Sequence, residues 1–294
     1  MRILVVGATG FVGSRLVRTL AERGHDVVAF SRSATEHSFP DGVEPFEGDL
    51  GQPGSLEGLC EDVDVAYYLI HSLTSENFAE RDREYARRFR ERASAADVDR
   101  VVYLSGISGD EADLSPHLAS RREVESVLAE GTFDLTVLRA AVIIGAGSAS
   151  FRIIDDLTDR LPLMLVPRWV RTPCQPIAVD DTIAYLVGLL DVDETRGGTY
   201  DIGGPSVWSY ESLLEATAAV KNKRVVILPV PVMTPELSSH WLRLTTDVQY
   251  AIARPLAESM RNPVTVDADR DLQQVVPIDR TPIEDAVRQA LSEA

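Results

Sequence analysis

The chain has 294 residues, of which 45% are hydrophobic, and its 46 acidic against 29 basic side chains give a formal net charge of -17. A chain of this length buries a full core and has room for one large domain and one smaller one. The acidic surface repels nucleic acid and anionic membranes, which excludes both as expected partners. The sequence holds no apolar run long enough to cross a bilayer and begins directly with a strand pattern, so we expect a soluble, cytoplasmic protein without a membrane span.

Lysine occurs only at Lys221 and Lys223, so nearly all of the positive charge is arginine. Together with the acidic excess, this is typical of a halophilic protein, because high salt screens the self-repulsion of such a charge. A GC-rich genome that favours arginine codons would give the same pattern. Cys60 and Cys174 are too few and too far apart for a disulfide framework or a metal site, so no metal is expected.

Residues 2–13 form an apolar run that breaks into three glycines before a helical pattern. Gly7 permits a tight bend out of a strand, Gly10 lets the backbone approach a pyrophosphate, and Gly13 lets the helix pack closely on the strand. The start of the helix then offers unpaired N–H groups to an anion. An ordinary strand-to-helix turn can also carry three glycines, but the context on both sides favours a nucleotide-binding turn.

Further along the chain, short apolar runs alternate with helical patterns. Buried strands are predicted at residues 3–6, 26–30, 65–70, 100–104 and 135–138. Helices are predicted at 11–23, 53–60, 76–96 and 116–130, and Gly24 and Gly131 fit left-handed caps after two of them. The alternation predicts right-handed β-α-β crossovers and an α/β fold with a doubly wound parallel sheet, whose ligands bind beyond the carboxyl ends of the strands.

Two strand ends carry residues suited to an adenosine. Arg32 follows the second strand, where an acidic residue usually meets a free ribose 2′-hydroxyl. Arginine instead suits a 2′-phosphate, which favours NADP over NAD as the cofactor, although Arg32 would equally serve as a solvated surface charge. Asp49, in Gly48-Asp49-Leu50, stands where a carboxylate can accept from an adenine amino group, or where an ordinary helix N-cap would lie.

Two later strand ends place hydroxyl groups and an imidazole at the same edge of the sheet. His71 and Ser72 follow the 65–70 strand, and Ser105 and Ser108 follow the 100–104 strand. We expect His71 to contact the cofactor and Ser105 to take part in catalysis.

The motifs occur in the order seen in extended and atypical short-chain dehydrogenases/reductases, which the chain resembles from residue 1 to about 205. It is most similar to the NAD(P)-binding, NmrA-like branch, which includes the Rossmann-type accessory subunit of respiratory complex I. The segments that carry the resemblance are Gly-Ala-Thr-Gly-Phe-Val-Gly at 7–13, Gly48-Asp49-Leu50, Leu104-Ser105-Gly106, Leu138-Arg139-Ala140, Ile-Ala-Val-Asp-Asp at 177–181 and Tyr-Asp-Ile-Gly-Gly at 200–204. The resemblance implies that Gly7, Gly10 and Gly13 hold the diphosphate, Thr9 and Phe11 flank it, Arg32 contacts the 2′-phosphate, and Asp49 and Leu50 contact the adenine.

The chain departs from this family at the catalytic pair. Catalytic members use Tyr-x-x-x-Lys, in which lysine holds the ribose and lowers the pKa of the tyrosine. Neither lysine of this chain follows a tyrosine by four residues, and alignment places His117 at the tyrosine position and Arg121 at the lysine position. The usual pair is therefore absent.

Two interpretations of His117 and Arg121 stay open. Residues four apart share a helix face, so the imidazole could deliver a proton to a carbonyl while the guanidinium holds the ribose hydroxyls. Alternatively, His117 lies on an exposed loop, and Arg121 and Arg122 pair with Glu123 and Glu125 on a solvated face.

After residue 205 the pattern changes, and residues 206–294 are expected to form a smaller substrate-side domain beside the cofactor domain at 1–205. The aromatic and apolar residues Trp208, Met233, Trp241 and 161–166 could line a cleft for an apolar substrate such as a quinone or isoprenoid, or belong to the core. Arg168 and Arg171 flank Trp169 and suit either an anionic group or solvated ion pairs.

Three functions are compatible with the sequence. The first is an NADP-dependent oxidoreductase of atypical chemistry acting on a small molecule. The second is a non-catalytic dinucleotide-binding protein that senses redox state or supports assembly of a redox complex. A sugar-nucleotide epimerase is the weaker third, because that reaction also depends on the missing tyrosine. The sequence does not specify the oligomeric state.

Overall fold

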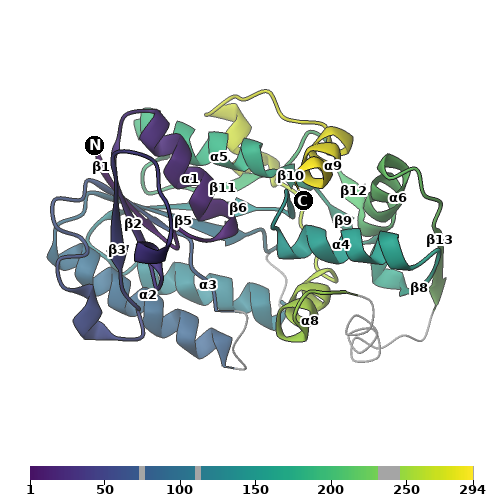
Figure 1. Cartoon of the computed structure of the whole chain (residues 1–294), viewed down its shortest axis with the longest axis horizontal. Helices are drawn as coiled ribbons and strands as arrows, with labels where there is room; N and C mark the ends of the chain where they lie inside the picture. The colour runs from purple at the N-terminus through teal and green to yellow at the C-terminus, as the bar shows by residue number, and fades with distance from the viewer. Residues whose placement is uncertain (73–76, 110–113, 231–245, 294) are drawn as a thin grey trace.

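A computed structural model describes residues 1–72, 77–109, 114–230 and 246–293, with only the backbone described at 168, 169 and 229. Its centre is a seven-stranded sheet in the order β11-β6-β5-β4-β1-β2-β3, in which every neighbouring pair is parallel (Figure 1). The strands are β1 (Arg2–Val6), β2 (Asp26–Ser31), β3 (Val43–Glu47), β4 (Val65–Tyr68), β5 (Arg100–Gly106), β6 (Asp134–Ala140) and β11 (Thr199–Ile202). The predicted doubly wound parallel sheet is confirmed.

Helices cover both faces of this sheet. Helices α1 (Phe11–Glu22) and α5 (Val179–Gly188) pack on one face, and α2 (Phe78–Ala95) and α3 (Pro116–Leu128) pack on the other, as the two layers in Figure 1 show. Side chains of β1 alternate between the two faces of the sheet, with Val5 on the α1 side and Leu4 on the α2 side. The apolar clusters on both faces together form the first core of the molecule. Both faces of the strand are therefore apolar, which explains the continuous apolar runs in the sequence.

The strand order reverses between β1 and β4, since β1 is followed by β2 on one side and flanked by β4 on the other. Ligands of doubly wound sheets bind in the crevice beyond the carboxyl ends of the strands at such a reversal. The glycine turn after β1 and the residues after β4 both lie at this reversal, so the topology places them at one site.

Two of the sequence predictions differ from the structure in detail. The segment 53–60 holds only a short 3-10 turn, η2 (Pro53–Leu56), instead of a full helix. Gly24 has a φ of 80° and is a left-handed cap as predicted, but Gly131 does not have a positive φ. A Cβ at Gly131 would lie 2.4 Å from the ring of Phe133, so a larger residue there would require that ring to move.

A second core lies beyond the carboxyl edge of the sheet, at the right of Figure 1. Its helices are α4 (Ala149–Arg160), α6 (Tyr210–Val220), α8 (Tyr250–Ser259) and α9 (Ile283–Ser292). Three two-stranded sheets accompany them, formed by β7 (Ile143–Ile144) with β10 (Ile177–Ala178), β9 (Pro173–Cys174) with β12 (Trp208–Ser209), and β8 (Leu163–Pro167) with β13 (Val226–Val230). Among the described residues, none of the helices combines the length and the apolar character needed to cross a membrane.

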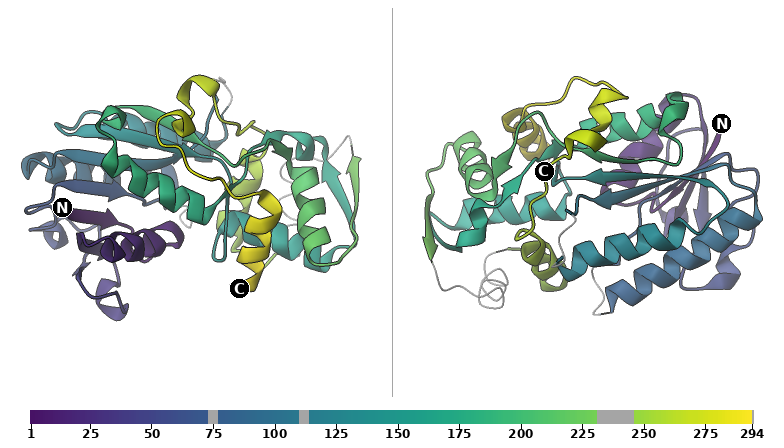
Figure 2. Two further views of the ribbon diagram at one scale, coloured as in Figure 1. Left: turned by 90° about the horizontal axis from the view of Figure 1, so that it is seen from above. Right: turned by 180° about the vertical axis from the view of Figure 1, so that it is seen from behind.

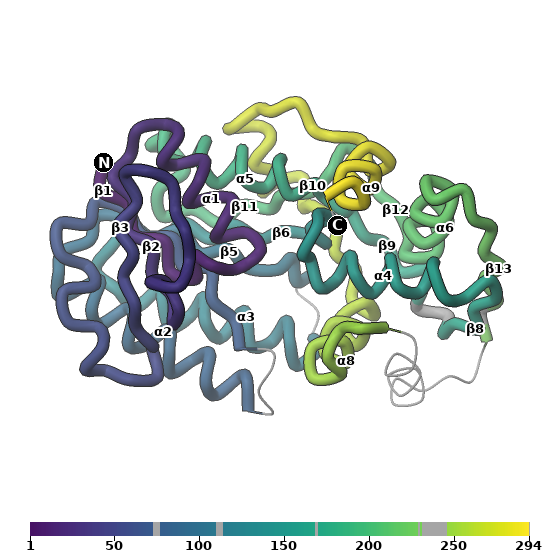
Figure 3. Tube along the Cα trace, in the orientation of Figure 1, coloured from purple at the N-terminus to yellow at the C-terminus, as the bar shows by residue number. Residues whose placement is uncertain are grey.

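The chain passes back and forth between the two cores, as the tube in Figure 3 allows the reader to follow. Residues 143–178 join the second core, and α5 and β11 then return to the first. In the C-terminal part, Leu272 and Val276 pack in the first core, whereas α9 packs in the second (Figure 2). Packing thus crosses the expected boundary at residue 205 in both directions.

Three buried carboxylates fasten the C-terminal segment to the rest of the chain. Asp156 accepts from the backbone N–H of residue 247 at 2.8 Å, Asp201 from that of residue 267 at 3.1 Å, and Asp181 from that of residue 281 at 2.8 Å. Burial raises the pKa of Asp181 and of Asp201. These contacts satisfy backbone donors of a segment that has little regular structure.

Candidate functional site

The turn between β1 and α1 is built almost entirely from backbone. Gly7 has a φ of 97°, a conformation that favours glycine, and its N–H donates to the carbonyl oxygen of Phe30 at 3.0 Å. The N–H of Gly10 donates to the carbonyl oxygen of Gly7 at 3.0 Å, which closes the turn directly before the helix. The chain therefore reaches α1 without any side chain standing in the turn at these two positions.

Gly13 is required by the close packing of α1 on the turn. A Cβ at this position would lie 2.1 Å from the carbonyl oxygen of Gly7, well inside any tolerated contact. A Cβ at Gly10 would lie 3.2 Å from the same oxygen, which is tight but tolerable. The turn thus requires glycine at Gly13 for lack of space and at Gly7 for its backbone conformation, whereas the approach of Gly10 to a pyrophosphate stays a prediction.

The N-terminus of α1 suits an anion. Gly10 is its N-cap and supplies no side-chain hydrogen bond, and the first turn of the helix contains no acidic residue. Nothing in the first turn therefore competes with a phosphate for the helix N–H groups or repels it. These features fit the diphosphate of a dinucleotide.

Thr9 lies in the turn and Phe11 begins α1, and both are half-buried, while their contact with a diphosphate stays a prediction. The Phe11 ring packs toward the loop at 145–147, and the guanidinium of Arg15 lies 4.9 Å from its centroid. Arg15 also donates to the carbonyl oxygen of Ala146 at 3.1 Å. Phe11 thus connects the start of α1 to the segment that begins the second core.

The candidate adenosine residues gather at the ends of β2 and β3. Arg32 is exposed directly after β2, and Leu50 is only 2% exposed and belongs to the first core. Asp49 Oδ1 accepts from the N–H of Gly51 at 2.7 Å, so the carboxylate shapes its own loop. This is a loop contact rather than the helix N-cap that the sequence offered as the alternative.

His71, Arg121 and His117 come together beyond β4 and β5. Arg121 Nη1 donates to the carbonyl oxygen of Ile70 at 3.3 Å, which places the guanidinium beside the backbone that leads into His71. His117 lies one turn before Arg121 on α3, whose N-cap Ser115 accepts from the N–H of Leu118 at 3.3 Å. Because the positions share a helix face, the imidazole of His117 lies near the same strand end.

Arg121 is buried in an ion pair with Asp82 of α2. The two side chains are 5% and 1% exposed. The alternative in which Arg121 pairs with Glu123 or Glu125 on a solvated face is therefore wrong, because Glu123 pairs with Arg83 and Glu125 with Arg139 instead. Whether Arg121 also holds a ribose stays a prediction.

Both histidines are neutral at pH 7 in this environment. Desolvation and the positive charge of Arg121 both lower the pKa of His71, and because its side chain is exposed, the charge of Arg121 is the cause that its position supports. Desolvation, Arg121 and His71 lower the pKa of His117 well below its usual value. The mutual effects show that the three groups are close enough for their charges to interact. The lowered pKa favours the neutral form of His117 near pH 7. The ring therefore lacks the extra proton that it would need to act as a charged proton donor.

Further polar groups lie buried around this corner. The hydroxyls of Tyr68, Tyr103 and Ser105 and the Nδ1 atom of His117 have no hydrogen-bond partner among the described residues. Burial raises the pKa of Tyr103 to about 12 and that of Tyr68 well above its usual value, so both phenols are protonated. Buried polar atoms of this kind mark places where a polar group of a bound ligand would supply the missing hydrogen-bond partner.

Sequence reasoning missed Asp82, Tyr68 and Tyr103. Asp82 lies 39 positions from Arg121 on a different helix, so no local spacing could pair them. The two tyrosines stood in apolar runs that indicated buried strands, and nothing in those runs separated a core ring from a ring whose hydroxyl meets a polar corner.

The candidate apolar cleft is only partly described. Met233 and Trp241 lie outside the described residues, and Trp208 is half-buried against the second core. Arg171 pairs with Glu211 at 2.8 Å, which agrees with the interpretation of this region as solvated ion pairs. Among the residues that the structure describes, no group of three or more His, Cys, Asp or Glu side chains is placed to hold a metal ion.

A sequence family of NAD(P)H-binding proteins matches residues 7–162. Among characterised relatives, a ceramide reductase of Caulobacter vibrioides is 30% identical over 67% of this chain and 66% of its own length. The photosystem II assembly factor Ycf39 of Synechocystis is 22% identical over 79% of this chain and 71% of its own length. The mitochondrial 40 kDa subunit of Neurospora crassa NADH-ubiquinone oxidoreductase is 27% identical over 79% of this chain and 64% of its own length. The chain thus spans about two thirds of these relatives.

The fold also matches a solved structure over the whole chain. Citrobacter triphenylmethane reductase superposes with a TM-score of 0.80 at 20% identity, covering 99% of this chain and 100% of that one. A second structure of that enzyme is complexed with NADP(H) and gives a TM-score of 0.78 over 98% of this chain and 99% of that one.

Proposed function

This chain belongs to the family of NAD(P)H-binding Rossmann proteins, and on that basis we propose that it is an NADP(H)-dependent oxidoreductase acting on a small apolar substrate such as a quinone or isoprenoid. Membership confirms the predicted resemblance to atypical short-chain dehydrogenases/reductases and to the complex I subunit. The observation that carries the proposed chemistry is the meeting of His71, His117 and Arg121 beyond β4 and β5, next to the glycine turn.

The turn after β1 would hold the cofactor diphosphate through Gly7, Gly10 and Gly13 and the N–H groups of α1. Thr9 and Phe11 would flank the diphosphate, and Asp49 and Leu50 would contact the adenine. Arg32 supports NADP over NAD, because it is exposed at the end of β2 and has no ion pair among the described residues. A guanidinium matches a phosphate with two parallel hydrogen bonds, whereas a 2′-hydroxyl needs an acceptor.

The bound cofactor would supply or accept a hydride. Because His117 is neutral, its contribution would be a hydrogen bond from the ring N–H to the oxygen that gains negative charge, and the proton that completes the reduction would come from ordered water. The ion pair of Arg121 with Asp82 would hold the guanidinium in place, and desolvation with the charge of Arg121 would favour the neutral form of His117. Ser105 would offer a hydroxyl to the same oxygen.

The two-part organisation belongs to the same proposal, with residues 1–205 serving the cofactor and 206–294 serving the substrate side. It is supported by a contact between the two parts at the active-site helix. The N–H of Ser115, the N-cap of α3, donates to Asn262 Oδ1 at 3.2 Å. A substrate bound by the second part would thus lie close to His117. The name of the ceramide reductase supports a lipid-like substrate.

A non-catalytic role is the second candidate. Two of the relatives are by name an assembly factor and a subunit of a respiratory complex, which favours a dinucleotide-binding sensor or assembly protein. The absence of a Tyr-x-x-x-Lys pair from the sequence supports the same alternative. An epimerase of sugar nucleotides is weaker, since that chemistry also relies on the missing tyrosine.

The test is the consumption of NADPH, followed at 340 nm, with a panel of quinones, isoprenoid carbonyls and simple aldehydes. We expect turnover with at least one apolar member, and His117→Ala should lower kcat about 100-fold while leaving the Kd for NADPH unchanged. His25→Ala is the matched control, because His25 lies at the opposite, amino edge of the sheet. Tight NADPH binding without turnover on any panel member would instead support the sensor or assembly role.

A further inference from the structure

Helix α2 borders a groove of about 770 Å³ that also reaches the loop after β3. Its lining includes Gly51 from that loop and Arg81 and Tyr85 from the helix. The loop is fixed to the helix, because Arg88 donates to the carbonyl oxygen of Leu50 at 2.7 Å. The groove is thus continuous with the candidate adenosine site at Asp49 and Leu50.

Arg81 differs from the other arginines of α2. Arg83, Arg87, Arg88 and Arg90 each form an ion pair with a glutamate, and Arg92 donates to the carbonyl oxygen of Pro53 at 3.3 Å. Arg81 is exposed and forms no ion pair with any residue that the structure describes. On this helix Arg81 is therefore the arginine whose guanidinium is held by neither a carboxylate nor a carbonyl oxygen of the described residues.

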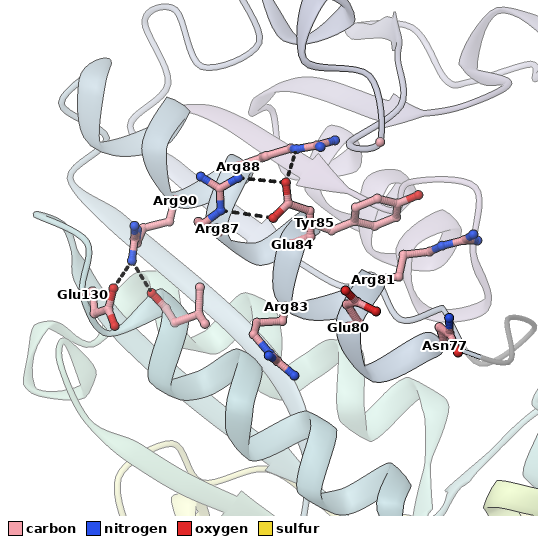
Figure 4. Close-up of a pocket in the computed structure, with 12 residues that line it drawn as sticks. Asn77, Glu80, Arg81, Arg83, Glu84, Tyr85, Arg87, Arg88, Arg90 and Glu130 are labelled. Atoms are coloured by element: carbon pink, nitrogen blue, oxygen red, sulfur yellow. Dashed lines mark hydrogen bonds and ion pairs between the residues drawn. The ribbon is translucent and has the colours of Figure 1, made fainter.

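Arg81 and Tyr85 are one turn apart and extend to the same side of α2 (Figure 4). The Tyr85 hydroxyl and Asp49 Oδ1 each lie 3.1 Å from the Cβ position of Gly51, so the tyrosine reaches the carboxylate proposed to meet the adenine. Desolvation and Asp49 raise the pKa of Tyr85, and the positive charges of Arg81 and Arg32 oppose that rise.

Arg32 approaches the same point from the sheet. It follows Ser31, which pairs in register with Glu47 of β3, and the N–H of Gly48 donates to the carbonyl oxygen of Ser31 at 3.1 Å. The ends of β2 and β3 are thereby held side by side, with Arg32 beside the 49–51 loop. Arg32 thus follows the strand end that leads into the 48–51 loop, and Arg81 borders the groove that reaches the same loop from α2.

We propose that Arg81 is a second arginine of the 2′-phosphate site and closes on that phosphate from α2 while Arg32 holds it from the end of β2. The proposal rests on the proposed function, because it assumes that a dinucleotide binds at the β1–α1 turn. A phosphate monoester carries more than one negative charge near pH 7, so two guanidinium groups can each form charge-assisted hydrogen bonds with it. Arg81 would thus add to the preference for NADP over NAD.

Titration calorimetry of the full chain with NADPH, NADH, adenosine 2′,5′-bisphosphate and 5′-AMP tests this assignment. We expect Arg81→Ala to raise the Kd for NADPH and for the bisphosphate about tenfold and to change the Kd for NADH and 5′-AMP less than twofold. Arg81→Lys keeps the charge but loses the planar fork, so it should lie between Arg81→Ala and the unsubstituted chain. Arg83→Ala is the control, since Arg83 is exposed on the same helix and pairs with Glu123.

An effect of Arg81→Ala no larger than that of Arg83→Ala, or an equal loss for NADPH and NADH, would overturn the role of Arg81 while leaving the proposed function standing. If the unsubstituted chain binds neither dinucleotide, the proposed function itself fails and the assignment fails with it. A thermal unfolding curve for each variant shows whether a loss of affinity reflects a folded protein, and we expect no change in Tm for either exposed arginine.

Discussion

The two ends of the candidate site are built by different means. At β1 and α1 the site is a backbone structure, in which three glycines leave room for a diphosphate and no side chain takes part. At β4 and α3 the site is a side-chain structure, in which two neutral histidines and unpartnered hydroxyls surround the buried Asp82–Arg121 pair. The β1–α1 end depends on the absence of side-chain atoms at its glycines, and the β4–α3 end depends on the charges of Asp82 and Arg121.

This difference bears on what each end can specify. A backbone turn recognises a diphosphate in whatever dinucleotide carries it, so it defines the cofactor class and little more. The side-chain end is formed by buried polar and charged groups, and desolvation together with the charge of Arg121 lowers the pKa values of the histidines that would face a substrate. The second end is therefore where the reaction of this protein would differ from that of its relatives.

The largest expected effect is on the charged end. Asp82→Leu leaves the Arg121 guanidinium buried without a partner, and we expect the free energy of unfolding to fall by about 4 kcal/mol in chemical denaturation. The double variant Asp82→Leu/Arg121→Leu removes both charges and should recover most of that loss. Glu130→Gln, which breaks the exposed pair with Arg90, is the control and should cost less than about 1 kcal/mol. A loss for Asp82→Leu as small as the control would show that the pair does not stabilise this corner.

The matching test at the backbone end is Gly13→Ala. The new methyl group would overlap the carbonyl oxygen of Gly7, so α1 must move away from the turn, at about 2–3 kcal/mol of stability. Because the turn no longer presents its N–H groups correctly, we expect both NADH and NADPH to lose at least about 100-fold in affinity. Gly54→Ala is the control, since nothing lies within 4 Å of its Cβ position. Unchanged affinity for both cofactors in Gly13→Ala would contradict the assignment of the turn.

The pH dependence of stability distinguishes the two ends further. His71 and His117 have lower pKa values in the folded chain than in the unfolded one, so between about pH 4 and 6.5 the unfolded chain binds more protons. The contribution of the two neutral histidines to the free energy of unfolding is complete above pH 6.5 and is lost as the pH falls through this range. We expect the free energy of unfolding to decrease from pH 7 to 5, and to decrease less in His117→Gln. Denaturant titrations at pH 5, 6 and 7 measure both slopes, and identical slopes would show that folding does not lower the pKa of His117.

The smallest expected effect concerns neither end. Arg171 is largely exposed and pairs with Glu211, so Arg171→Ala should change the free energy of unfolding by no more than about 0.5 kcal/mol. If the protein reduces a substrate, KM should also stay within twofold. A several-fold rise in KM without a change in stability would indicate that Arg171 binds an anionic group after all.

The sequence predicted the sheet and the glycine turn because both follow from local patterns. The five predicted strands and the helix that begins at Phe11 depend on apolar runs and on glycines at fixed spacing, and the structure places them as expected. The pairing of Arg121 with Asp82, by contrast, joins residues 39 positions apart on two helices and leaves no mark on local spacing. Gly131 shows the intermediate case, since its place after a helix is visible in the sequence but the ring of Phe133 that lies against it can only be seen in three dimensions.

The route of the C-terminal segment has a consequence for how the protein is made. Leu272 and Val276 complete the first core and α9 completes the second, so neither core can close until about nine tenths of the chain has left the ribosome. A chain cut at residue 205 would expose apolar surface on both lobes at once, and we expect such a fragment to aggregate rather than to persist as an isolated cofactor domain.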